Sequence, residues 1–209
     1  MRKKRSEIVS IAKQEISQNL KSYIIITIIF LIGIFLGTLF VNQINSKEEI
    51  SKYITTYIDE TKSIEKIDYF TELQKDIKEN ILLVILLWFA GTTIIGIPIV
   101  LALIIFRGFC LGYTIASSVY VLGKIKGIIF VLITIFLQNL VFIPVIIILG
   151  VSSIKLYKSI IKDKRKENIK ISIIKHSVLS LAMLALLILS SVIKIEISYR
   201  MIVNLIKYF

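Results

Sequence analysis

The sequence has few of the residues that usually carry chemistry or cross-links, with 1 Cys, 1 His and 2 Pro among 209 residues. The single cysteine, Cys110, excludes an intrachain disulfide. His176 stands beside Lys175 at the edge of an apolar run, where we expect a rim position without a role. No G-x-S-x-G or H-E-x-x-H motif and no glycine-rich phosphate-binding loop is present. We therefore expect a protein that is not an enzyme and that uses no metal or cofactor.

Charge of either sign is absent over long stretches, which indicates the solvent of this chain. Hydrophobic residues make up 56% of the sequence, and the mean hydropathy is +0.84. Several uncharged runs exceed the ~20 residues that span a hydrocarbon core ~30 Å thick. We expect an integral membrane protein of one domain, with membrane lipids as partners. Basic cytoplasmic loops explain the net charge of +12, so no nucleic-acid partner is expected.

Five apolar segments are expected to cross the membrane as helices, so the predicted fold is all-α and polytopic. The predicted spans are residues 23–41, 81–106, 108–123, 127–150 and 177–193. The first is longer than the apolar core of a cleavable signal peptide and no A-x-A site follows it, so it should remain as a signal-anchor. The third reaches only about 24 Å, so Arg107 and Lys124 should reach the membrane surfaces from its two ends.

The distribution of basic residues predicts the orientation. Segments 1–22 and 154–176 are rich in Lys and Arg, whereas loop 42–80 has six Lys against nine Asp and Glu, a net charge of −3. Basic loops stay in the cytoplasm, so an even number of crossings must separate the two basic segments. Segment 108–123 must therefore cross. The N-terminus is expected in the cytoplasm and the C-terminus outside the bacterial cell membrane.

Helical periodicity also occurs outside the spans. Residues 1–22 and 194–209 are expected to form amphipathic helices on the two membrane surfaces. In loop 42–80, Ser46-Lys-Glu-Glu49 fits a capping box, and apolar residues then recur at helical spacing. These apolar faces either rest on the membrane or the bundle, or they form a docking face for an extracytoplasmic partner. The candidate docking residues are Tyr53, Ile54, Tyr57, Ile58, Ile67 and Phe70.

Small residues within the spans suggest close packing of helices. Two G-x-x-x-G motifs, Gly33 with Gly37 and Gly108 with Gly112, allow helix backbones to approach each other. The second and fourth predicted spans are also interrupted by helix-bending residues: Gly91, Gly96, Pro98 and Pro144. Each proline removes one backbone hydrogen bond and frees the carbonyl four residues earlier.

Two amides are predicted at the midpoint of span 127–150, where water cannot satisfy them. Gln138 and Asn139 must bond to facing helices or to freed carbonyls. They either hold helices together or line a polar substrate site between broken helices. No Asp or Glu lies between Glu79 and Asp163, and the basic residues of that interval are expected at helix ends. An ion-coupled pump or carrier, which places ionisable groups at the midplane, is therefore disfavoured.

Residues 106–150 carry a resemblance to a known family. They contain Phe106-Arg-Gly-Phe-Cys-Leu-Gly-Tyr-Thr114, a short turn at Gly123-Lys-Ile-Lys-Gly127, and Gln138-Asn139 followed five residues later by Pro144. With the chain length, the charged N-terminal segment, five predicted spans and one helical exterior loop, the chain resembles the stage II sporulation protein M family over nearly its whole length.

The resemblance implies a role in endospore formation. It implies a non-enzymatic membrane scaffold that recruits stage II sporulation proteins D and P, the cell-wall hydrolases, to the septum during forespore engulfment. It also implies a location in the sporulation septum and the engulfing membrane. Because the wider family occurs outside sporulation, a second hypothesis stays open. It is a small permease-like or lipid-handling membrane protein that uses kinked spans 81–106 and 127–150.

Overall fold

The computed structural model describes residues 14, 16–43, 50–52, 55–56, 69–93, 96–132, 137–162 and 169–205. Within these ranges the chain is helical except for short turns, and no strand occurs, so the predicted all-α class is confirmed. The helices are α2 (Leu20–Gln43), α4 (Tyr69–Thr92), α5 (Gly96–Leu122), α6 (Lys124–Val131), α7 (Leu137–Lys162) and α8 (Ile169–Leu205).

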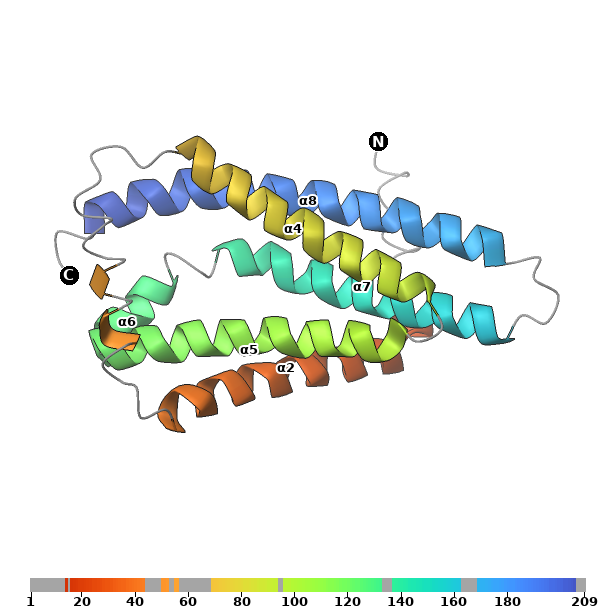
Figure 1. Ribbon diagram of the computed structural model, residues 1–209, viewed down its shortest axis with the longest axis horizontal. Coiled ribbons are helices and arrows are strands. Elements are labelled where there is room, and N and C mark those ends of the chain that lie inside the picture. Colours follow the sequence, from red (N-terminus) through yellow and green to blue (C-terminus); the bar gives the residue numbers. More distant parts are fainter. Residues whose placement is uncertain are drawn as a thin grey trace.

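The five long helices form a bundle in which consecutive helices run in opposite directions (Figure 1). The short helix α6 lies at one end, here called the α6 end, together with the end of α2 and the starts of α4 and α7. The opposite end holds the start of α2, the α4–α5 junction and the junction between α7 and α8.

Within the described ranges, four helices are long and apolar enough to cross a membrane: Leu20–Gln43, Gly96–Leu122, Asn139–Ile161 and Ile169–Glu196. Helix α4 runs alongside them, but its first half carries charged side chains, among them Glu72, Lys75 and Asp76. The predicted first span, 23–41, corresponds to α2. A fifth crossing, by α4, stays a prediction.

The predicted boundary between the second and third spans is wrong. We expected helices over 81–106 and 108–123, separated at Arg107, but the break lies before Gly96 and α5 continues to Leu122. A Cβ on Gly96 would overlap the carbonyl oxygen of Ala90, so the turn requires glycine. Pro98 is the third residue of α5, where a missing N–H costs no helical hydrogen bond. Pro98 therefore does not kink a span.

The predicted fourth span, 127–150, is also wrong, because it is divided between α6 and α7. The expected turn at Gly123 is present, with a φ of 81° that favours glycine. Helix α7 starts at Leu137, which puts Gln138 and Asn139 in its first turn instead of at the middle of a span. Pro144 lies inside α7, as expected, and is exposed.

The basic loop predicted over 154–176 is shorter than expected, since α7 runs to Lys162 and α8 begins at Ile169. The predicted span 177–193 lies wholly within α8. Helix α8 continues to Leu205, so most of the predicted segment 194–209 extends this helix. Of the predicted N-terminal helix 1–22, residues 1–13 lie outside the described ranges.

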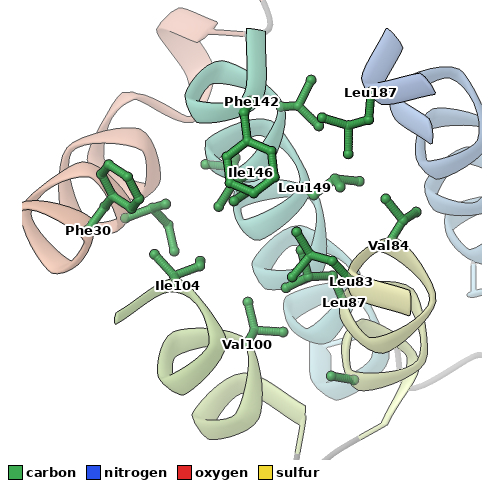
Figure 2. Close-up of a cluster of buried hydrophobic side chains, with 14 residues drawn as sticks. Phe30, Leu83, Val84, Leu87, Val100, Ile104, Phe142, Ile146, Leu149 and Leu187 are labelled. Carbon is green, nitrogen blue, oxygen red and sulfur yellow. The ribbon is translucent and has the colours of Figure 1, made fainter. Parts of the chain in front are cut away.

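Every long helix contributes buried side chains to the core of the bundle (Figure 2). Its fully buried members include Ile26, Leu87, Ile104, Leu149 and Leu187. Large apolar side chains are exposed on the outer faces, for example Phe35 at 61% and Leu181 at 66%. Apolar residues inside and outside are typical of a bundle surrounded by lipid.

Helices α2 and α5 approach closely through their glycines. A Cβ on Gly33 would overlap the carbonyl oxygen of Ile105, and a Cβ on Gly112 would overlap that of Ile34. Gly37 and Gly108 face backbone atoms in the same way. The two G-x-x-x-G motifs therefore meet in one interface, where only glycine lets the backbones come so near.

Candidate functional site

A cavity of about 200 Å³ lies among the first half of α4, the middle of α5, the first turns of α7 and the later part of α8. It is lined mainly by polar and charged side chains, which is unusual inside an otherwise apolar bundle. The lining residues are Asp76, Glu79, Asn80, Arg107, Cys110, Leu111, Thr114, Asn139, Phe142 and Lys194.

The local sequence explains why the cavity forms here. The first half of α4 is charged, whereas residues 80–92 are uncharged and pack into the core. Helix α6 ends at Val131, and α7 begins only at Leu137. Four helices therefore surround this region, but α7 reaches it only with its first two turns, Asn139 and Phe142 lining the wall.

An ion pair joins α4 to α8 at the cavity wall. Lys194 Nζ lies 2.6 Å from Asp76 Oδ1, with the side chains 30% and 12% exposed. Asn80 Nδ2 donates to Ser191 Oγ at 2.8 Å and to Asp76 Oδ2 at 3.3 Å. The Asp76 carboxylate is thus satisfied from both helices, and these contacts hold the charged half of α4 against α8.

Arg107 occupies the middle of α5, so its predicted place at a helix end is wrong. It lies 11 residues after Gly96, about 17 Å along a helix of about 40 Å. Its guanidinium lies over the Phe142 ring, 5.4 Å from the ring centroid. Within the described part of the chain it forms no hydrogen bond or ion pair. The sequence argument against ionisable groups inside the spans therefore does not hold at this residue.

The remaining wall residues are already partly satisfied. Thr114 Oγ1 donates to the carbonyl oxygen of Cys110 at 2.8 Å, which uses its hydroxyl proton within α5. Asn139 is half-buried at the cavity. The side chain of Gln138 lies outside the described residues, so its predicted bond to a facing helix or a freed carbonyl stays a prediction.

Most candidate docking residues also lie outside the described ranges. Tyr53, Ile54, Tyr57, Ile58 and Ile67 are in this group. Phe70, in the first turn of α4, is 64% exposed. Ile50 is only 7% exposed and packs with Val41 and Tyr113, which anchors the start of the loop to the bundle at the α6 end.

A second polar cluster, toward the opposite end, was missed by sequence reasoning. His176 is 2% exposed, so its predicted rim position is wrong, and its Nδ1 lies 2.8 Å from Ser152 Oγ. Its Nε2 has no hydrogen-bond partner among the described residues, and a Cβ on Gly91 would meet it at 2.8 Å. Nearby, Trp88 Nε1 donates to Ser177 Oγ at 2.9 Å. Gly91 is thus explained by close packing against α7 and α8.

No group of three or more His, Cys, Asp or Glu side chains in the described ranges is placed to hold a metal ion. Cys110 is a free thiol on the cavity wall.

The helical bundle with its exposed apolar exterior defines a polytopic membrane protein, and a polar cavity opens among four of its helices. The family Stage II sporulation protein M matches residues 26–196, which extend from α2 to α8. The chain belongs to this family and is therefore a sporulation-related membrane protein. Comparison with curated proteins and with solved structures finds no match.

Proposed function

We propose that this protein is a non-enzymatic membrane scaffold that recruits and positions cell-wall hydrolases during forespore engulfment. The observation that carries the proposal is the family match, because it covers residues 26–196, which is most of the bundle and not a single motif. Stage II sporulation proteins D and P are the proposed partners, and the sporulation septum and engulfing membrane are the proposed location.

The arrangement of the helices supports an orientation in which the α6 end faces the cell wall. The start of α2 and the α7–α8 junction share the opposite end (Figure 1). The basic segments 1–22 and 154–176 adjoin those positions in the sequence. Because basic segments stay in the cytoplasm, the opposite end is the cytoplasmic one, and loop 42–80 lies outside.

A docking surface outside the membrane has to be held in place and still be accessible. The burial of Ile50 against Val41 ties the loop to the bundle, and the exposure of Phe70 leaves an apolar side chain at the start of α4. The apolar stripe of Tyr53, Ile54, Tyr57 and Ile58 lies between these two points in the sequence. We propose that this stripe binds the hydrolases as a helix face in a groove.

The test is a double substitution on the stripe, Tyr53→Glu with Tyr57→Glu. Two carboxylates on an apolar docking face carry a desolvation cost that should abolish binding. Insertion should be unchanged, since span hydrophobicity governs it and these residues lie outside the spans. Affinity purification from sporulating membranes would measure recovery of proteins D and P, and microscopy would follow engulfment. We expect loss of recovery and stalled engulfment.

The matched control is Thr55→Glu with Thr56→Glu. Both threonines are exposed, and the change adds the same two charges beside the apolar stripe. Recovery of the hydrolases by this control variant should match the unaltered protein. Full recovery by a correctly inserted Tyr53→Glu/Tyr57→Glu variant would rule out the stripe as the docking site.

A further inference from the structure

The polar cavity contains two charged groups that the bundle leaves without a partner. Arg107 and Glu79 both line it, and within the described ranges neither side chain forms an ion pair or a hydrogen bond. Among the described residues no ion pair joins Arg107 to Asp76, whose two oxygens accept from Lys194 and Asn80. A guanidinium and a carboxylate thus face one cavity, and a ligand that carries one negative and one positive group could bind both.

From this pairing we infer that the cavity binds the headgroup of a zwitterionic phospholipid, one that carries a phosphate diester and a nearby ammonium. The phosphate binds Arg107 and the ammonium binds Glu79. The inference does not depend on the hydrolase proposal, since it concerns the protein and lipid alone.

The geometry of Arg107 suits a phosphate. A guanidinium presents a planar fork of N–H donors that matches two oxygens of a phosphate. Its contact with the Phe142 ring, at 5.4 Å from the centroid, fixes the group by cation–π attraction without using its N–H donors. Lys194 adds a second source of donors at the wall, since an ammonium has three and its bond to Asp76 uses one.

Glu79 makes the cavity selective for a headgroup that carries an ammonium as well as a phosphate. The four ionisable side chains at the wall, Arg107, Lys194, Asp76 and Glu79, sum to zero formal charge. A purely anionic headgroup would leave the Glu79 carboxylate near its own negative charge. A headgroup with an ammonium neutralises Glu79 instead, so a phosphoethanolamine lipid is favoured over a phosphoglycerol lipid.

The surroundings of the cavity suit the acyl chains of a lipid. Phe106 and Leu140 adjoin the wall residues Arg107 and Asn139 in the sequence, and they are 59% and 61% exposed. Leu111 and Phe142 add apolar surface to the wall itself. A soluble phosphate compound gains nothing from these apolar side chains, whereas a lipid does.

Cys110, the single cysteine of the chain, allows a direct test without labelling mutations. It lines the cavity one helical turn after Arg107, so a bound headgroup should shield its thiol. The purified full-length protein in neutral detergent would be alkylated with N-ethylmaleimide and followed by intact mass. The added probes are phosphatidylethanolamine, phosphatidylglycerol, and soluble phosphoethanolamine at the same concentration.

We expect phosphatidylethanolamine to slow alkylation of Cys110 more than phosphatidylglycerol does, and soluble phosphoethanolamine to have no effect. Arg107→Gln should require at least about tenfold more phosphatidylethanolamine for the same protection. Glu79→Gln should remove the preference for phosphatidylethanolamine over phosphatidylglycerol. Each variant is compared with itself in the absence of lipid, which corrects for altered thiol reactivity.

Two matched controls isolate the cavity from the general charge of the protein. Lys124→Gln removes one exposed positive charge on α6, and Glu72→Gln removes one exposed negative charge on α4. Neither residue lines the cavity, so both variants should behave as the unaltered protein does.

Three outcomes would overturn the inference. One is no protection of Cys110 by any lipid in the unaltered protein, a result that needs no variant to fold. Another is equal protection by soluble phosphoethanolamine, which would assign the site to a free phosphate compound. The last is unchanged protection in a folded Arg107→Gln variant, which would remove Arg107 as the phosphate ligand.

Discussion

At the scale of single residues, the charged groups within the bundle are arranged in two different ways. Asp76 and Lys194 satisfy each other across α4 and α8, with Asn80 as a further donor. Arg107 lies over the Phe142 ring and forms no hydrogen bond or ion pair within the described ranges. The first arrangement stabilises the fold, whereas the second leaves a cation available to a ligand.

The ion pair gives a prediction for stability. Lys194→Met should lower the free energy of unfolding in detergent by about 1–3 kcal/mol, because it removes the ammonium that faces a mostly buried carboxylate. The double variant Lys194→Met with Asp76→Asn should recover most of the loss. Lys75→Met, which removes an exposed lysine from the same region of α4, is the control. Thermal unfolding of the purified protein is the measurement, and equal stability of Lys194→Met and Lys75→Met would show that the pair contributes nothing.

At the scale of helices, α2 and α5 form the closest pair in the bundle through their facing glycines. Backbone carbonyls of each helix lie where a Cβ of the other would be. In lipid there is no hydrophobic force between apolar helices, so such close van der Waals contact is a main source of association. The α4–α5 break before Gly96 then turns the chain so that α5 can lie along α2.

The glycine interface predicts a strong effect of side-chain size. Gly112→Leu should lower the free energy of unfolding by about 1–3 kcal/mol, since the added atoms would overlap the backbone of α2 at Ile34. Ala102→Leu adds apolar atoms to an exposed position of α5 and should have little effect. Titration with a denaturing detergent would compare the two variants. Equal stability would mean that the helices do not meet at their glycines.

At the scale of the whole molecule, the sequence predicted the family, the all-α class and the first helix. The length of an uncharged apolar run predicts a helix such as α2 well, because polar residues mark both ends of the run. It could not locate the break before Gly96, since the uncharged run continues through it to Phe106. Gly96 and Pro98 mark the break between the two helices, but their presence in the sequence predicted only a kink.

The cavity could not have been predicted in the same way. A lone arginine between apolar runs is expected at a membrane surface, because burying a charge in lipid is costly. In the fold, other helices surround Arg107 with a polar cavity instead of lipid. The cavity arises because α7 starts late and the first half of α4 is charged. Asp76 and Lys194 are separated by 118 residues in sequence, and only the fold brings them together.

The scaffold proposal requires a bundle that crosses the membrane five times with its α6 end outside, so topology is its central claim. Single cysteines would replace Glu60, Arg165 and Lys207 in turn, in a Cys110→Ala background. An impermeant thiol reagent would then be applied to intact cells and to permeabilised cells. Positive-inside orientation predicts labelling of positions 60 and 207 in intact cells, and of position 165 only after permeabilisation. Labelling of position 165 in intact cells would contradict the five-crossing arrangement and the outward placement of the docking loop and the cavity.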